Sequence, residues 1–418
     1  MTRPLSLMAA ATLAAAAVAA TPTASAAVPA GTVAPADVAT PAVVKHVNTD
    51  MDGDGTRDSV DLTYLGSDQF ELAVTTTKGK TSKVSFTSHV DADMVPAAMT
   101  WYGADAIDGR KGSELIVHLY APGVTDSGQN LDVAVYTWRS GKLVAEPAPQ
   151  ARTGTGWQVG VGEGSEQGAG YWFFASHGRR YVDTTRLSMS GGTPRYTGSV
   201  TRSVWRKDHW VELWSRSLKA KTLTWKQTGM AGPKLLRGQV KVDISGDGRT
   251  DLALFYQLGL EKYRVTVLAH GRSASADVTH WKFPFIGAAA VDGVAGDELI
   301  AMTGSKGDWT VFTWRHSGKL TKLRAPALYG EAGNSPTWHR AKGAGWTNVT
   351  LSVESGRHYV VTAWSLPTNT ADPVTVRFAR SVWDGNHWTK LSEWTDQLTL
   401  DQLMLLGDGF TAPDLVTP

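Results

Sequence analysis

Two short stretches of the sequence carry acidic residues at the same fixed spacing. In the first, residues 48–64, aspartates occupy relative positions 1, 3, 5 and 9, namely Asp50, Asp52, Asp54 and Asp58. In the second, residues 241–256, the same positions are held by Asp243, Ser245, Asp247 and Asp251. Carboxylates this close together repel one another unless a cation neutralises them. The pattern therefore indicates an ion site in each stretch.

Glycines alternate with the acidic residues in both loops. They let the backbone curl tightly enough to direct alternate side chains inward. A hard divalent cation prefers such a cage of oxygens, and Ca²⁺ is the ion that we expect. The residue at position 7 would add its backbone carbonyl as a further ligand. We thus predict two calcium sites, with the ligand sets Asp50, Asp52, Asp54, Thr56 and Asp58, and Asp243, Ser245, Asp247, Arg249 and Asp251.

A helix–loop–helix calcium site is the competing interpretation of such a loop. It requires a helix on each side and an acidic ligand at position 12. Asp61 occupies that position in the first loop, but Leu254 occupies it in the second. The first loop is followed by Val60, Leu62 and Tyr64 alternating with polar residues, which is the period of a half-buried strand. We therefore expect the loops to join strands.

The N-terminus indicates export. Residues 1–26 combine a basic residue near the start, an apolar run over Leu5–Ala20 and an Ala-Ser-Ala cleavage motif, as in a secretory signal peptide of bacterial type. We expect a flexible Ala/Pro linker over 27–44 and a secreted, extracellular protein over 45–418. Later stretches fall short of the ~18 apolar residues of a membrane span, so membrane insertion is not expected.

The 418 residues include no cysteine and carry a formal net charge of +2. An exported protein without disulfides must gain its rigidity from core area and from bound metal. The small net charge argues against nucleic acid as a partner. We expect a monomer.

Five landmarks occur twice in the same order. The acidic loops lie 193 residues apart (243 − 50), and DGRKGSELI at 108–116 matches DGVAGDELI at 292–300. The third landmark is RSVWRKDHW at 202–210, which matches RSVWDGNHW at 380–388. The last two are TWRSGKL at 137–143, which matches TWRHSGKL at 313–320, and GRRY at 178–181, which matches GRHY at 356–359. Chance does not produce five ordered matches. The sequence thus predicts two repeats, about 45–235 and 236–418, from one duplicated ancestor.

Each repeat consists of runs rich in Val, Thr, Tyr and Trp between polar turns, which predicts an all-β fold. The acidic loop with the strand that follows it resembles the FG-GAP or VCBS repeat of integrin-type β-propellers, in which this loop joins two strands of a blade and holds Ca²⁺. The segments that begin at Asp108 and Asp292 resemble degenerate members. Each keeps a closing glutamate but has lost the position-5 carboxylate, so we expect a tight turn that needs no ion there.

The resemblance implies three blades of roughly 60 residues in each repeat, and hence a β-propeller of about six blades. Seven blades would result if the two ends of the chain combined into one. Two tandem β-sandwiches, one for each repeat, are the alternative fold.

Eight of the 17 tryptophans recur at strand positions in both repeats, which favours core packing. They are Trp138, Trp205, Trp210 and Trp214, with counterparts Trp314, Trp383, Trp388 and Trp394. Trp157 and Trp346, each beside an expected turn, are the candidates for an exposed surface that stacks on sugar rings. The sequence contains no Gly-x-Ser-x-Gly, no His-Glu-x-x-His and no cysteine nucleophile, and we assign no catalytic residue.

The expected function is a binding or adhesion module for an extracellular polysaccharide or protein. The alternative is a secreted carbohydrate-active enzyme, hydrolase or lyase, on the same scaffold, and a third possibility is a purely structural envelope protein. A cleft with two carboxylates outside the calcium loops would distinguish the enzyme from the binding module.

Overall fold

The computed structural model describes residues 41–89, 97–119, 131–149, 156–161, 167–189, 196–259, 261–280, 284–303, 308–315, 318–330, 334, 338, 346–365, 373–406 and 409–417. The expected signal peptide and the linker up to residue 40 lie outside these residues. Strand β1 begins at Ala42, slightly before the expected start of the folded part at residue 45. None of the helices in the described residues is long and apolar enough to cross a membrane.

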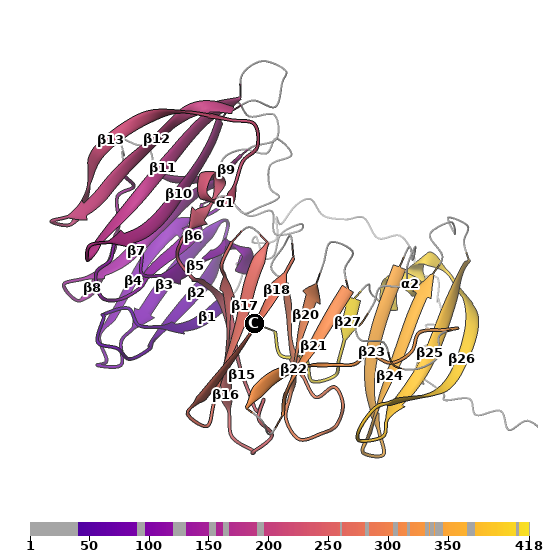
Figure 1. Cartoon of the computed structure of the whole chain (residues 1–418). Coiled ribbons are helices and arrows are strands. Elements are labelled where there is room, and N and C mark those ends of the chain that lie inside the picture. The colour runs from indigo at the N-terminus through magenta and orange to yellow at the C-terminus, as the bar shows by residue number, and fades with distance from the viewer. Residues whose placement is uncertain are drawn as a thin grey trace, which may run out of the picture. The chain divides into compact units, whose positions relative to one another are not determined.

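The described chain is all-β, as predicted, and its strands follow one another in antiparallel meanders (Figure 1). Three of the sheets are meanders of four strands each. These are β1 (Ala42–Thr49), β2 (Asp58–Gly66), β3 (Gln69–Thr75) and β4 (Thr81–Thr87); β15 (Leu235–Val242), β16 (Asp251–Gln257), β17 (Lys262–Ala269) and β18 (Arg272–Thr279); and β19 (Phe285–Ala289), β20 (Glu298–Thr303), β21 (Asp308–Arg315) and β22 (Lys319–Leu323).

Two further meanders share one ten-stranded sheet because β7 pairs with β9. Its strands are β5 (Trp101–Asp105), β6 (Glu114–His118), β7 (Leu131–Arg139), β8 (Lys142–Ala145), β9 (Trp157–Val161), β10 (Gln167–Ser176), β11 (Arg179–Met189), β12 (Tyr196–Arg206), β13 (His209–Ala220) and β14 (Met230–Ala231). A 3-10 turn, η1 (Ala97–Thr100), precedes β5, and the short helix α1 (Trp225–Thr228) precedes β14. Strand β14 runs parallel to β10.

The last sheet has five strands and ends in the same way. Strand β27 runs parallel to β23, as β14 does to β10, and a short helix again precedes it. The elements are β23 (Trp346–Glu354), β24 (Arg357–Ser365), β25 (Val374–Trp383), β26 (Trp388–Leu398), α2 (Leu400–Leu406) and β27 (Gly409–Thr411). The sheets of the described residues are open, so the propeller remains a prediction.

The hydrophobic core lies between consecutive meanders. Leu115 and Val117 on one face of β6 pack with the β1–β4 sheet, whereas Ile116 on the other face packs with β9–β11. Strand β6 is therefore buried on both faces, which explains why Leu-Ile-Val at the centre of its sequence, ELIVH, does not alternate with polar residues. Other core clusters join β15–β18 to β19–β22, and β19–β22 to β23–β27.

Of the eight tryptophans that recur in both repeats, Trp138, Trp314 and Trp388 are buried in the core as expected, whereas Trp394 is 39% exposed. Trp157, for which we expected an exposed surface, is buried. Its side chain is 2% exposed, and its indole N–H donates to the carbonyl of Glu146 at 2.8 Å. Trp338 does the same to Leu323 at 3.1 Å, so Trp338 is the structural counterpart of Trp157. The expectation of a surface role for Trp157 was wrong, because strand β9 begins at this residue and faces the core. The side chain of Trp346 lies outside the described residues.

Consecutive meanders also meet at their acidic loops. The N–H of Ser113 donates to the carbonyl of Asp50 at 2.7 Å, and Asp297 donates to Asp243 over the same distance. Gly53 lies so close to the next loop that an added Cβ would approach the Lys111 Cβ at 2.5 Å. Gly55 has an equally left-handed backbone, but nothing lies within 4 Å of the place of its missing Cβ.

This pair of glycines allows loop packing to be separated from backbone strain. We predict that Gly55→Ala lowers the free energy of unfolding by about 1 kcal/mol, which is the strain of alanine at positive φ. Gly53→Ala should lower it clearly further, because its methyl group also collides with the neighbouring loop. Urea unfolding in EDTA would measure both without any contribution from metal. Equal losses for the two variants would show that the contact with Lys111 does not hold the loops together.

Candidate metal centre

The first acidic loop is wrapped around the carboxylate of Asp50. This residue follows β1, and its two oxygens accept hydrogen bonds from the N–H groups of Gly53 at 2.8 Å and Gly55 at 2.9 Å. Gly53 and Gly55 have φ values of 76° and 89°, which only glycine adopts without strain. The alternation of glycine with aspartate is thus what folds the loop back on its first carboxylate.

Asp58 has a different place from the other aspartates. It is the first residue of β2 and fully buried, and one oxygen accepts from the N–H groups of Met51 at 2.8 Å and Asp52 at 3.3 Å. The other oxygen accepts from Thr77, after β3, at 2.9 Å. Asp58 therefore closes the loop and ties it to the next strand, a role that the sequence did not suggest.

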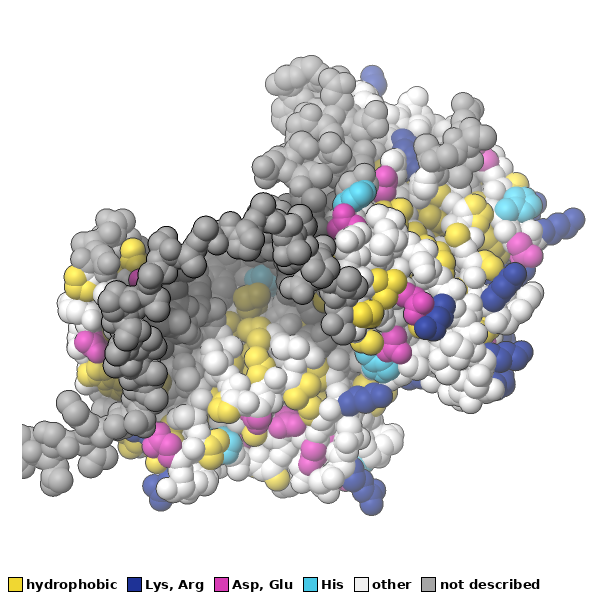
Figure 2. Space-filling view, turned by 180° about the vertical axis from the view of Figure 1, so that it is seen from behind, with side chains coloured by type: hydrophobic (Ala, Val, Ile, Leu, Met, Phe, Trp, Pro, Cys, Tyr) yellow, Lys and Arg dark blue, Asp and Glu magenta, His cyan; other side chains and the backbone are white. Residues whose placement is uncertain are grey.

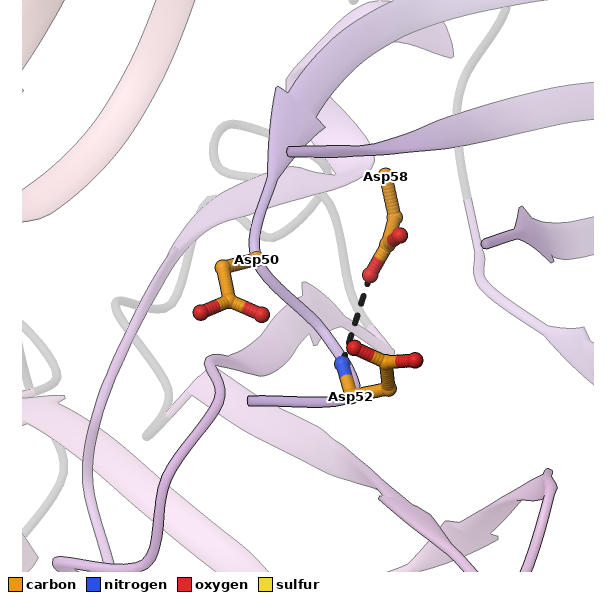
Figure 3. A group of neighbouring side chains, drawn as sticks. All are labelled: Asp50, Asp52 and Asp58. Carbon is orange, nitrogen blue, oxygen red and sulfur yellow. Dashed lines mark hydrogen bonds between the residues drawn. The ribbon is translucent and has the colours of Figure 1, made fainter. Parts of the chain in front are cut away.

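Three of the predicted ligands converge. Asp50, Asp52 and Asp58 each place one oxygen within 4.8 Å of the others (Figure 3). Three carboxylates at this separation offer the hard oxygen ligands that Ca²⁺ or Mg²⁺ prefers. The chemistry of the residues therefore fits the predicted ion.

Asp54, a further predicted ligand of the first loop, pairs with other groups, and Thr56 lies beside it. Asp54 accepts from the N–H of Thr56 at 2.8 Å and forms an ion pair with Lys78 at 2.7 Å. The Lys78 ammonium also lies 3.6 Å from Asp52. The hydrogen bond from Lys78 and those from Thr56 hold the pKa of Asp54 well below its usual range. A lysine thus supplies positive charge at the place where the prediction puts a cation.

The second loop repeats this folding pattern. Asp243 accepts from Gly246 and Gly248, both at 2.7 Å, and Asp251 accepts from Ser245 at 2.8 Å. His270 takes the position of the lysine, with its ring nitrogens 2.9 Å from the Ser245 hydroxyl and 3.4 Å from Asp247. Within the described chain, this loop does not contribute to a group of three converging acidic side chains. Calcium binding by Asp243, Ser245, Asp247, Arg249 and Asp251 remains a prediction.

Negative charge nevertheless accumulates beside the second loop. Asp297, whose N–H donates to Asp243, is half-buried. Burial and the charges of Asp414 and Asp243 raise the pKa of Asp297 to about 6. A cation in this region would relieve that repulsion.

The two degenerate loops keep the closing carboxylate. Glu114, the first residue of β6, accepts from Ile107 at 2.6 Å and from the Thr137 hydroxyl at 3.1 Å. Glu298, the first residue of β20, accepts from Val291 at 2.9 Å and from Thr313 at 3.1 Å. The closing carboxylate of these loops thus accepts from the loop backbone as Asp58 does, although their position-5 residues are Arg110 and Val294.

Comparison of the chain with protein-family models and with curated proteins gives no match.

The position of Lys78 predicts that it competes with a bound ion. We expect Lys78→Gln to raise the affinity for Ca²⁺ about two- to fivefold, the effect of removing one exposed charge. Isothermal titration calorimetry would measure this. The matched control is Lys83→Gln, because Lys83 pairs at 2.8 Å with Glu71, outside the loop, and its loss should leave the affinity unchanged. An affinity that stays the same or falls in Lys78→Gln would argue against an ion between Asp50, Asp52 and Asp58.

Proposed function

We propose that the protein is a secreted, calcium-stabilised β-propeller that acts as a binding module for an extracellular polysaccharide or protein. The observation that carries the proposal is the convergence of Asp50, Asp52 and Asp58 in a loop between two strands. An ion held there would link β1 to β2, and its binding energy would contribute to folding. This suits an exported chain without disulfides.

The arrangement of the sheets supports the propeller. Antiparallel meanders follow one another, and core clusters join the first to the second, the second to the third, the fourth to the fifth and the fifth to the sixth. Related features occupy related places in the two predicted repeats. The parallel strands β14 and β27 and the four loops closed by a carboxylate are examples.

Exposed aromatic rings support the binding role. Trp394 on β26 is 39% exposed and stacks on Phe378 of β25, with ring centroids 5.0 Å apart and an interplanar angle of 4°. On the opposite face of β25, Arg377 lies over the rings of Trp364 and Tyr329. Flat rings with polar neighbours suit the faces of sugar rings. On the coloured part of the face in Figure 2, acidic and basic side chains are interspersed, which suits a neutral ligand better than a polyanion.

The pockets lined by described residues favour the binding module over the alternative, a carbohydrate-active enzyme. A glycosidase needs two carboxylates on one cleft. A pocket of about 310 Å³ beside the second acidic loop is lined by Ser245, His270, Arg272, Trp314 and Gly318. Three other pockets, of about 280 to 400 Å³, likewise have no Asp or Glu among their described lining residues.

The calcium part of the proposal predicts a metal-dependent melting temperature. Thermal unfolding should occur at a lower temperature in EDTA and recover when Ca²⁺, but not Mg²⁺, is added back. A ligand at a hundredfold excess over its dissociation constant stabilises the folded state by about 2.7 kcal/mol. Asp50→Asn, which removes one converging carboxylate, should reduce the response. A melting temperature that changes with neither EDTA nor Ca²⁺ would overturn the calcium proposal.

The binding part predicts that the exposed ring pair matters. We expect Trp394→Ala to weaken binding to a soluble polysaccharide by about two- to tenfold, because one stacking surface is lost. Affinity electrophoresis against a panel of neutral glycans would identify the ligand and measure the loss. Leu391→Ala is the control, since Leu391 is also exposed on β26 but has no ring. Equal losses in both variants would show that stacking on Trp394 plays no part.

A further inference from the structure

A second group of three acidic side chains lies inside the protein and includes none of the aspartates of the loop of Asp50. Asp108, Glu114 and Glu146 each place one oxygen within 4.8 Å of the others, and all three are buried. Asp108 belongs to the degenerate loop before β6, Glu114 begins β6, and Glu146 follows the end of β8. Glu146 therefore reaches the group from a strand that the acidic-loop motif does not include.

The positive charge near this group is too small to balance it. Arg139 of β7 forms an ion pair with Asp108 and lies 3.8 Å from Glu114. Among the described residues, no second lysine or arginine forms an ion pair with the three carboxylates. Burial, and next to it the charge of Asp108, raises the pKa of Glu114 to about 8. Burial and both neighbouring carboxylates also raise the pKa of Glu146 well above its usual range.

Glu146 differs from its two neighbours in its hydrogen bonds. Asp108 accepts from the N–H of Arg110 at 2.7 Å and from Arg139, and Glu114 accepts from two N–H groups and a hydroxyl. Both oxygens of Glu146 lack a hydrogen bond within the described part of the chain, although the side chain is only 4% exposed. The indole N–H of Trp210 is near enough to lower the pKa of Glu146, but it too has no hydrogen bond of ordinary geometry there.

The other half of the chain shows that this position does not require a carboxylate. The carbonyl of Glu146 accepts from Trp157, and that of Leu323 accepts from Trp338, so the two residues occupy corresponding places. Leu323 is 6% exposed and packs within the core. An apolar side chain thus satisfies the fold, whereas a buried carboxylate without hydrogen bonds destabilises it.

We propose that Asp108, Glu114 and Glu146 form a buried site for a hard divalent cation. In this site both carboxylate oxygens of Glu146 are free to coordinate the ion. The site offers carboxylate oxygens and no nitrogen or sulfur ligand among its three residues, which selects Ca²⁺, Mg²⁺ or Mn²⁺ over zinc or copper. Ca²⁺ is the best match, because Mg²⁺ demands a regular octahedron and keeps several of its waters. The site is separate from the loop of Asp50 and does not depend on the proposed function.

The test counts bound ions in the full chain. Apoprotein prepared with EDTA is dialysed against Ca²⁺, and bound metal is measured by mass spectrometry for the wild type, Glu146→Leu, Asp50→Asn and the double variant. Glu146→Leu introduces the residue found at the corresponding place in the other half. We expect it to bind about one Ca²⁺ per chain fewer than the wild type, and Asp50→Asn to lose a different ion, so that the two losses add. Tb³⁺ luminescence excited through tryptophan should fall in Glu146→Leu and persist in Asp50→Asn, because Trp210 and Trp157 lie beside Glu146.

Unchanged Ca²⁺ binding by Glu146→Leu would overturn the proposed site. If the three residues share protons instead of a metal, Glu146→Leu will bind as much Ca²⁺ as the wild type and will melt at a higher temperature with or without Ca²⁺. That stabilisation is the usual result when an apolar side chain replaces a buried charge. Glu146→Gln, which keeps the shape of the side chain, decides the question if the leucine variant does not fold: loss of one ion supports the site, and an unchanged ion count rejects it.

Discussion

Each acidic loop depends on one hydrogen-bonded carboxylate at the start of the strand that follows. Asp58, Glu114, Asp251 and Glu298 are the first residues of β2, β6, β16 and β20. Each is buried and accepts hydrogen bonds from backbone N–H groups of its own loop. Hydrogen bonds to a charged oxygen are stronger than those between neutral groups, so the loop folds around this side chain. The pairing of the strand before the loop with the strand after it begins at this contact.

Because these loops also contact one another, their charges are concentrated in a small region. The hydrogen bond from Ser113 to Asp50 and that from Asp297 to Asp243 place each degenerate loop against the acidic loop before it. The glycines at the contact allow an approach that a side chain would prevent. Lys78 balances part of the charge in the first loop, and the ring of His270 lies beside Asp247 in the second. A cation would balance the rest at no loss of packing.

The sequence was sufficient to predict the all-β class, because period-two alternation at Val60 and Leu62 and the apolar run of β6 both reflect burial. The spacing of Asp50 and Asp52 likewise predicted their convergence. Two features of the structure could not be predicted from the sequence. Asp58 has the same residue type as its neighbours, so only its contacts with Met51 and Thr77 reveal that it closes the loop. Trp157 follows a glycine-rich segment typical of a turn, but packing against Tyr171 and Phe173 buries it.

Comparison of the loops within one chain separates what folding needs from what it does not. Glu114 and Glu298 close loops that lack a position-5 carboxylate, so the closing residue alone suffices for the turn. Asp50 accepts two hydrogen bonds that shape the first loop, but its charge also adds a repulsion that the degenerate loops, with Ala106 and Ala290 at position 1, do not have. Glu146 presents the same case in the core, since Leu323 occupies the corresponding place. In both comparisons the surplus charge consists of carboxylate oxygens that converge. A bound divalent cation would neutralise these carboxylates, and their convergence would then stabilise the fold instead of destabilising it.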